Sequence, residues 1–309
     1  MRVLVTGGAG FIGSHVVDAL LARDHEVAVL DDLSTGHETN LPRDARFEQI
    51  DLRNREALHA FVESVRPDVV CHQAAQTSVA VSAREPVRDA EINIIGSLHL
   101  LDACVRFEVP RLVFASTGGA IYGEVAEGER ATPEWPAKPL SPYACAKLSI
   151  ERYLDAYRVE HGLASTVLRY ANVYGPRQDP HGEAGVVAIF ARRLLAGEPI
   201  QINAMIEPGD DGCVRDYVFV DDVVRANLEA IEGRLKGTVN VATGVPTTTR
   251  DIADGLIRAL AIDSPAMGVG PRRAGDLRRS VLEPDLRLPT PTSLDVGIAG
   301  TAKWFTDPS

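Results

Sequence analysis

The segment SPYACAK, residues 141–147, carries the side chains of this sequence that are best suited to acid–base chemistry. Its Tyr143 and Lys147 stand four positions apart, so a helix would place both side chains on one face. A free tyrosine has a pKa of about 10 and is a poor base at neutral pH, but a neighbouring cation favours the phenolate and lowers that pKa. The pair therefore predicts a base for a substrate hydroxyl, although Tyr and Lys at this spacing are common on any helix.

Two hydroxyl residues, Ser116 and Thr117, end a predicted strand upstream of Tyr143. The carboxyl end of a strand in a doubly wound sheet faces the crevice where ligands bind, so one of them could hydrogen-bond the same substrate oxygen as Tyr143. Alternatively, both hydroxyls only satisfy backbone groups at the strand end. We predict Thr117 as the catalytic hydroxyl, and the sequence leaves Ser116 open.

A glycine-rich turn, TGGAGFIG, follows the first apolar run and opens a helical segment. The spacing of Gly7, Gly10 and Gly13 lets the backbone turn sharply, and it lets a pyrophosphate approach free N–H groups at the helix N-terminus. A second predicted strand ends in Asp31 and Asp32, whose carboxylates could accept hydrogen bonds from an adenosine ribose and would repel a 2′-phosphate. Strand, glycines, helix and acid in this order predict NAD as the cofactor.

The turn and the Tyr–Lys pair together predict oxidation of an alcohol. An oxidised nicotinamide beside Tyr143 would add a second positive charge and would accept the hydride that leaves the substrate carbon. Asp51, at the end of the third predicted strand, could reach the adenine edge or could simply be solvated.

Predicted strands and helices alternate through the first half of the chain. The strands are expected at residues 2–5, 26–30, 47–49, 69–72, 112–116 and 165–170. The helices are expected at residues 14–23, 55–65, 89–105 and 143–160. Several strands lack polar alternation, as expected where both faces are covered. The fold class is therefore predicted as α/β, with a doubly wound parallel sheet of the Rossmann type and a smaller, irregular C-terminal substrate domain.

The alternation fades after Asn172, where Gly, Pro and Asp become frequent. Two later strands are expected at 217–220 and 238–241, and the stretch 123–142 is expected to be a surface loop. We predict two domains from this pattern. The NAD-binding domain would cover residues 1–171 with a returning segment at about 217–244, and the substrate domain would cover residues 172–216 and 245–309.

Composition excludes several functional classes. The chain has 309 residues and a net charge of −11, which argues against nucleic acid or an anionic membrane surface as a partner. Its four cysteines lie far apart without a CxxC pair, so neither disulfides nor a metal site are expected. A strand-like run begins within two residues of the start, and no apolar run approaches the ~20 residues of a membrane helix. We expect a soluble, cytoplasmic protein.

With these motifs the sequence resembles the extended short-chain dehydrogenase/reductase family, and within it the UDP-glucose 4-epimerases. The resemblance covers nearly the whole chain. Besides the glycine turn, it is carried by DDL at 31–33, DLRN at 51–54, HQAA at 72–75, Asn93, SPY at 141–143, Lys147, YAN at 170–172, RDYVFVDD at 215–222 and GDL at 275–277.

The resemblance implies the residues of an NAD site and of a UDP-sugar site. Besides the three glycines, the cofactor residues would be Phe11, Ile12, Asp31, Asp32, Leu33, Ser34, Thr35, Gly36, Asp51, Leu52, Gln73, Ala74, Ala75, Asn93, Tyr143, Lys147 and Tyr170. The UDP-sugar would be held by Thr117, Tyr143, Asn172, Arg215, Arg273 and Asp276. Arginine suits phosphate oxygens because it offers planar, charged donors, although a surface ion pair is the alternative for each.

Related nucleotide-sugar dehydratases carry an acidic residue directly after the Ser/Thr hydroxyls, because elimination of water needs a further acid and base. Here Gly-Gly-Ala follows Thr117. The resemblance therefore implies interconversion of UDP-glucose and UDP-galactose by oxidation and re-reduction at C4, with NAD held tightly. The small Ser280 would also leave space for an N-acetyl group, unless it is an ordinary solvated serine.

Two other functions stay open at this point. One is an epimerase or reductase for UDP-glucuronate or another nucleotide-sugar, and the other is a non-catalytic NAD-binding regulator. The regulator is disfavoured because the glycine turn, Tyr143, Lys147 and the hydroxyl residues are all present.

The resemblance also implies a homodimer in which helices around residues 93–105 and 143–157 pair between subunits. Their apolar stripe includes Leu98, Leu101, Leu148 and Leu154. The same stripe could instead pack within a monomer.

Overall fold

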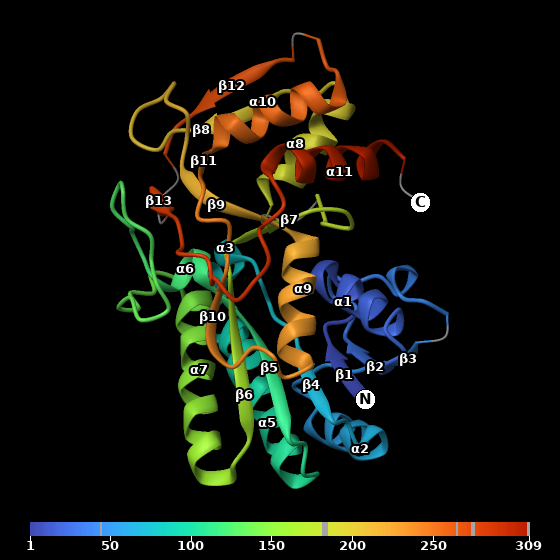
Figure 1. Cartoon of the computed structure of the whole chain (residues 1–309). Coiled ribbons are helices and arrows are strands. Elements are labelled where there is room, and N and C mark those ends of the chain that lie inside the picture. Colours follow the sequence, from blue (N-terminus) through green and yellow to red (C-terminus); the bar gives the residue numbers. More distant parts are fainter. Residues whose placement is uncertain (44, 181–184, 264, 273–275, 308–309) are drawn as a thin grey trace. The chain divides into compact units, whose positions relative to one another are not determined.

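The computed structural model describes residues 1–43, 45–180, 185–263, 265–272 and 276–307 (Figure 1). The chain divides into two compact units. The first unit contains Met1–Thr117, Ser141–Arg169 and Val223–Val239, and the second contains Gly118–Leu140, Tyr170–Asp222 and Asn240–Ser309. Among the described residues, no helix is both long and apolar enough to cross a membrane.

A seven-stranded sheet forms the centre of the first unit, in the order β10-β6-β5-β4-β1-β2-β3. Its strands are β1 (Arg2–Thr6), β2 (Glu26–Asp31), β3 (Arg46–Gln49), β4 (Val69–His72), β5 (Arg111–Thr117), β6 (Ala164–Tyr170) and β10 (Gly237–Val241). β1 pairs in parallel with β2 and β4, and β2–β3 and β4–β5 are parallel as well. The strands predicted in the first half are found within one residue at each end, and the predicted fold class is confirmed.

Helices cover both faces of this sheet (Figure 1). The helices of this unit are α1 (Phe11–Leu21), η1 (Glu38–Asn40), α2 (Arg55–Val65), α3 (Val79–Arg84), α4 (Pro86–Ala90), η2 (Glu91–Gly96), α5 (Ser97–Arg106), α7 (Pro142–His161) and α9 (Val220–Ile231). α2, α5 and α7 bury their apolar side chains against one face, in a core that includes Leu58, Leu101 and Leu154. α1 and α9 lie on the other face.

The single helix predicted over residues 89–105 is wrong in detail, because it is divided into α4, η2 and α5. η2 is a π-helical turn in which the Ser97 hydroxyl donates to the Asn93 carbonyl at 2.7 Å. At Gly96 a side chain would lie 2.8 Å from Leu52 Cβ, so the turn packs directly on the segment that follows β3. Such turns are frequent at functional sites.

The strand order reverses between β1 and β4, since β2 and β3 lie to one side and β5 and β6 to the other. The chain segments that leave these two strands touch: a Cβ on Gly7 would lie 2.6 Å from the Ala74 nitrogen. Ligands of open α/β sheets bind at this kind of reversal, beyond the carboxyl ends of the strands. The sheet therefore places the cofactor motif at its expected edge.

The second unit contains two small sheets and is more regular than predicted. One sheet consists of β7 (Asn172–Tyr174), β9 (Val214–Phe219), β11 (Pro246–Thr248) and β13 (Arg279–Ser280), and the other of β8 (Ile200–Asn203) and β12 (Met267–Gly270). Its helices are α6 (Gly118–Ile121), α8 (Val186–Leu195), α10 (Thr249–Leu260) and α11 (Leu294–Thr306). The strand predicted at 217–220 is β9, which starts three residues earlier and ends before Val220.

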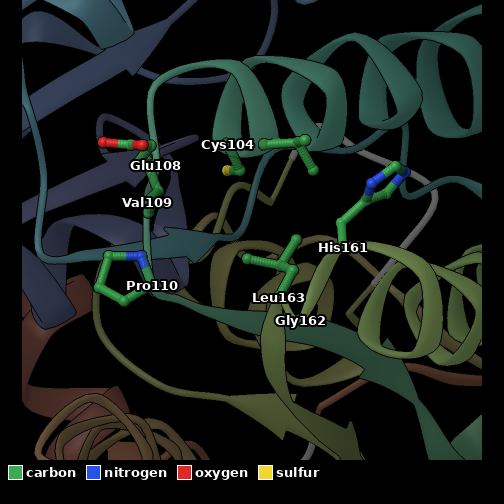
Figure 2. A pocket seen from close by; sticks show the side chains of 8 residues that line it. Cys104, Glu108, Val109, Pro110, His161, Gly162 and Leu163 are labelled. Carbon is green, nitrogen blue, oxygen red and sulfur yellow. The ribbon is translucent and has the colours of Figure 1, made fainter.

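A surface pocket of the first unit lies where β5 and β6 begin, and Figure 2 shows the side chains that line it. It is lined by Cys104 and Val105 of α5, by Glu108 to Pro110 before β5, and by His161 to Leu163 between α7 and β6. Because β5 and β6 begin here, the pocket faces the amino ends of the strands. It is therefore separate from the glycine turn and from Tyr143.

Candidate active site

The glycine turn has the shape that a pyrophosphate requires. Gly7 has a φ of +69° and donates its N–H to the Leu30 carbonyl at 2.7 Å. A Cβ on Gly13 would lie 2.0 Å from the Gly7 oxygen, so this position cannot take a larger residue without moving the turn. At Gly10, directly before α1, a Cβ would meet a single neighbour at 3.3 Å. The first N–H groups of α1 can thus receive an anion at close range.

Asp31 lies under this turn and supports it. The carboxylate is 6% exposed and accepts hydrogen bonds from the N–H groups of Ala9 at 3.0 Å and Leu33 at 2.9 Å. Burial raises the pKa of Asp31, and the backbone hydrogen bonds oppose that shift. Gly36 closes over the same carboxylate, because a Cβ there would lie 3.0 Å from Asp31 Oδ1. The segment predicted to hold the adenosine ribose therefore wraps around the glycine turn.

Asp32 is exposed, and its Oδ1 accepts from the N–H of Ser34 at 2.9 Å and from its hydroxyl at 2.6 Å. Asp51 forms an ion pair with Arg53, with Oδ2 2.5 Å from Nη2. The hydrogen bonds from Arg53 lower the pKa of Asp51. The sequence alternatives for Asp51, the adenine edge or plain solvation, did not include this partner.

A chain of hydrogen bonds that the sequence did not reveal runs beneath the turn. The Ser97 hydroxyl donates to the Asn93 carbonyl, so Ser97 Oγ accepts from His72 Nε2 at 2.9 Å. His72 Nδ1 then accepts from the Thr6 hydroxyl at 2.7 Å, and Thr6 Oγ1 accepts from the Ala74 N–H at 3.3 Å. Every donor in the chain has one acceptor, which fixes the His72 tautomer with its proton on Nε2.

His72 is 1% exposed and is held in its neutral form. Burial, and secondarily the charge of Lys147, lowers the pKa of His72 to about 3. A second ring proton would also collide with the proton that Thr6 donates. This series of hydrogen bonds therefore joins β1, β4 and η2 and supports the predicted cofactor segment.

Asn93 has a structural role in addition to any contact with a ligand. Its Oδ1 accepts from the Gln76 N–H at 2.9 Å, and its Nδ2 donates to the Gln76 carbonyl at 2.9 Å and to Asp89 Oδ1 at 2.9 Å. Gln73 is also tied down, because its Nε2 donates to Asn227 at 2.9 Å. The loop that follows β4 is thus clamped from two sides.

Tyr143 and Lys147 lie on the inner face of α7, at its first two turns. The helix starts with Ser141, whose hydroxyl accepts from the Ala144 N–H at 3.2 Å. Lys147 is 4% exposed, donates to the Ala115 carbonyl at 2.9 Å and has its Nζ 6.0 Å from the centre of the Tyr143 ring. Burial lowers the pKa of Lys147 to about 8, and nearby carboxylates oppose that shift.

The two strand-end hydroxyls have different partners. The Thr117 side chain lies near the Tyr143 hydroxyl and lowers the pKa of Tyr143. Ser116 Oγ donates at 2.6 Å to Glu151, which is paired with Arg169 through an Oε2–Nη2 contact of 2.5 Å. The structure therefore brings Thr117 to Tyr143 and engages Ser116 elsewhere. Glu151 was missed, although it follows Lys147 by four positions on the same face of α7.

The chain by itself does not lower the pKa of Tyr143. Burial raises this pKa well above its usual value, the negative charge of Asp89 raises it further, and the hydrogen bond with Thr117 lowers it. The predicted shift toward the phenolate therefore cannot come from Lys147 alone. It requires a further positive charge such as an oxidised nicotinamide.

Of the predicted sugar-nucleotide residues, Thr117 and Tyr143 lie in the first unit, and Asn172, Arg215 and Asp276 lie in the second. Asn172 opens β7, and its Oδ1 lies 2.9 Å from the point where a side chain on Gly119 would begin. Arg215 of β9 donates to the carbonyls of Val214 at 3.0 Å and Leu277 at 2.7 Å. Arg215 therefore lies against the segment that contains Asp276. Arg273 lies outside the described residues.

Asp216, beside Arg215, is a second buried acid that the sequence did not single out. It is 1% exposed and accepts hydrogen bonds from the Thr243 N–H and hydroxyl at 2.9 and 2.7 Å and from the Gly244 N–H at 2.9 Å. These contacts anchor the end of β10 to β9. The cofactor residue predicted at Tyr170 is 6% exposed at the end of β6.

Comparison with known proteins decides the family. Residues 3–242 match the model of the NAD dependent epimerase/dehydratase family. The chain belongs to this family. The predicted resemblance and the predicted dependence on NAD are thereby confirmed.

Several members of this epimerase/dehydratase family are similar over the full length. The UDP-glucose 4-epimerase of Mycolicibacterium smegmatis is 42% identical, with all of both chains covered. A crystal structure of Thermus thermophilus UDP-glucose 4-epimerase in complex with NAD is 52% identical with a TM-score of 0.97, again with all of both chains covered. The Thermotoga maritima enzyme with UDP-glucose is 46% identical with a TM-score of 0.94, covering 100% of this chain and 99% of the other.

Proposed function

We propose that this chain is an NAD-dependent UDP-glucose 4-epimerase, which interconverts UDP-glucose and UDP-galactose by oxidation and re-reduction at C4. One observation carries the proposal: Tyr143 lies beside Thr117, with the buried Lys147 ammonium 6.0 Å from the centre of its ring, at the same end of the sheet as the glycine turn. The names of three full-length relatives support the same activity.

The cofactor site fits NAD. The close approach available at Gly10 and the N-terminus of α1 suit a pyrophosphate, and the acids at the end of β2 suit a ribose without a 2′-phosphate. Bound NAD supplies the hydride acceptor and, once reduced, the hydride donor. Because the same cofactor is restored in each cycle, we propose that it stays bound and that the enzyme needs no added NAD.

The chain's own residues manage the proton. Tyr143, ionised beside the cationic cofactor, takes the proton of the C4 hydroxyl as the hydride leaves, and returns it when the hydride comes back to the other face. Thr117 hydrogen-bonds the same oxygen and keeps it in place. Lys147 contributes positive charge and, through the Ala115 carbonyl, a fixed position under the tyrosine.

The absence of an acid after Thr117 favours epimerisation over dehydration. Gly118 and Gly119 occupy these positions, and a side chain at Gly119 would collide with Asn172 Oδ1. We propose that Asn172, Arg215, Arg273 and Asp276 hold the UDP part. The guanidinium of Arg215 suits phosphate oxygens. Backbone carbonyls accept only some of its five N–H donors, so the others can bind a phosphate.

A second substrate is supported by Ser280 of β13. Its side chain is 2% exposed, and its Oγ has no hydrogen-bond partner among the described residues. A buried hydroxyl without a partner can accept an amide N–H, so we propose that the N-acetylated pair of UDP-sugars is also a substrate. Ser280→Tyr should then abolish turnover of UDP-N-acetylglucosamine and retain turnover of UDP-glucose. Equal loss of both activities would contradict this role.

We also propose a homodimer, formed through exposed residues of α7 and not through the leucine stripe named in the sequence analysis. Leu101 and Leu154 are each 1% exposed and belong to the core of the first unit. Tyr153 and Val159 of α7 are exposed instead, at 43% and 77%. Sedimentation of the wild type and of a Tyr153→Asp, Val159→Asp variant tests this, because a dimer through α7 should dissociate in the variant.

The activity is tested with purified protein, a panel of UDP-sugars that includes UDP-glucuronate, and no added cofactor. We expect UDP-glucose and UDP-galactose to interconvert, with the C4 configuration of the product determined by NMR. Tyr143→Phe should lower kcat by about 10²–10⁴-fold, the usual contribution of general acid–base catalysis. Tyr153→Phe, an exposed tyrosine on the same helix, is the matched control. Full activity of Tyr143→Phe would overturn the mechanism.

A further inference from the structure

Asp89, on the last turn of α4, is a buried carboxylate that the proposed reaction does not use. Its side chain is 2% exposed. Oδ1 accepts hydrogen bonds from Gln76 Nε2 at 2.8 Å and Asn93 Nδ2 at 2.9 Å, and both donors are neutral amides. Among the described residues, no cation lies within ion-pair distance of Asp89. A buried charge of this kind is costly unless another charge nearby compensates for it.

The nearest positive charge that interacts with Asp89 is Lys147 of α7, the helix that packs against α4. Its ammonium is buried, donates to the neutral Ala115 carbonyl, and forms no ion pair among the residues that the structure describes. Glu151 also lies near Lys147, but Arg169 already neutralises it. Asp89 is therefore the negative charge near Lys147 that has no ion-pair partner of its own among the described residues.

Other charges do not take over this role. α4 packs against α3, η2 and α7. The charged residues of α3 and η2 are Arg84 and Glu91, and both are exposed, as is Arg88 on α4 itself. From α7, the groups that interact electrostatically with Asp89 are Lys147 and Tyr143.

We propose that Asp89 is a positioning residue that sets the proton affinity of the Tyr143–Lys147 pair through its negative charge. The inference rests on the proposed function, because it concerns the same site. The charge acts on both partners in the same direction: it stabilises the ammonium of Lys147 and disfavours the phenolate of Tyr143. Removing it should therefore make both groups lose their protons at lower pH.

Asp89→Asn removes the charge and keeps an oxygen that can accept from Gln76 and Asn93. Activity needs Tyr143 ionised and Lys147 protonated, so both limbs of the pH profile should move to lower pH by about one unit. On the logarithmic limbs this corresponds to about tenfold more activity at the acid end and about tenfold less at the alkaline end. Asp89→Glu should keep the wild-type profile.

The matched control is Glu85→Gln, the same charge change at an exposed position four residues away. It should leave both limbs in place. Loss of activity by one factor at every pH in Asp89→Asn would overturn the proposal, because a merely structural role predicts that result. If Asp89→Asn does not fold, Asp89→Ser removes the same charge with a smaller side chain that can still accept a hydrogen bond.

A readout independent of turnover is the near-ultraviolet absorbance of tyrosinate. The difference between the NAD-bound wild type and NAD-bound Tyr143→Phe reports the ionisation of Tyr143, and its midpoint should fall in the Asp89→Asn background. An unchanged midpoint would overturn the proposal. If the wild type epimerises no UDP-sugar, the proposed function fails, whereas this titration still tests Asp89.

Discussion

Replacing His72 with leucine tests the hydrogen-bond chain beneath the glycine turn. The substitution removes two hydrogen bonds, to Thr6 at 2.7 Å and to Ser97 at 2.9 Å, and leaves the Thr6 hydroxyl without its acceptor. One lost hydrogen bond costs about 1 kcal/mol and an unsatisfied buried donor about 1–3 kcal/mol. We therefore expect His72→Leu to lower the free energy of unfolding by about 2–4 kcal/mol at pH 7.5.

The same substitution should change the pH dependence of stability. The folded pKa of His72, about 3, lies below the unfolded value of about 6.5, so the unfolded state binds more protons between these values. Stability from the neutral ring is therefore complete above pH 6.5 and is lost as pH falls toward 3. At pH 4.5, two units below the unfolded pKa, the wild type should have lost about 3 kcal/mol through this group. His72→Leu has no imidazole to protonate and does not lose this stability, so the difference in unfolding free energy between the two proteins should shrink toward zero at pH 4.5.

Urea unfolding followed by circular dichroism at pH 7.5, 5.5 and 4.5 measures this gap, with NAD at the same saturating concentration throughout. His37→Leu, at an exposed histidine, is the control and should keep the wild-type pH slope. A difference between wild type and His72→Leu that stays constant from pH 7.5 to 4.5 would refute the argument for a buried, neutral imidazole.

Three further substitutions test separate parts of the site. Gly13→Ala places a methyl group 2.0 Å from the Gly7 oxygen, so the purified variant should carry at least about tenfold less NAD, measured by release and chromatography of the cofactor. Thr117→Val should lower kcat about 10²-fold, whereas Ser116→Ala should change kcat little, because Ser116 donates to Glu151. Steady-state kinetics measures both variants, and a larger loss of kcat in Ser116→Ala than in Thr117→Val would contradict the assignment of Thr117. Glu151→Gln breaks a buried ion pair and should cost about 3–5 kcal/mol of stability in urea, far more than Glu160→Gln on the exposed end of α7.

The sheet was predictable because its strands are covered on both faces, so each appears as an apolar run with turn residues at its ends. β4, Val69–His72, is fully buried and was predicted to the residue. The division of 89–105 was not predictable, because helical periodicity carries no signal for the wider turn of η2. That turn is held by contacts with other segments, where Ser97 meets His72 and Gly96 meets Leu52.

The placement of Tyr143 and Lys147 on one face of α7 was predictable from their spacing, but their surroundings were not. Thr6 and His72 are 66 positions apart, and His72 and Ser97 are 25 apart, so no local pattern connects them. The choice between Ser116 and Thr117 depends on Glu151, which is 35 positions from Ser116. The pairing of Asp51 with Arg53 is local, by contrast, and could have been predicted from their spacing.

The most direct test of the central claim follows a deuterium atom placed at C4 of UDP-galactose. We predict that the reduced cofactor forms transiently on the enzyme and that the label returns to C4 of the product UDP-glucose without exchange into water. We also predict that Tyr143→Phe slows the appearance of the reduced cofactor. Loss of the label to solvent, its appearance at another carbon, or cofactor reduction at the wild-type rate in Tyr143→Phe would contradict this claim.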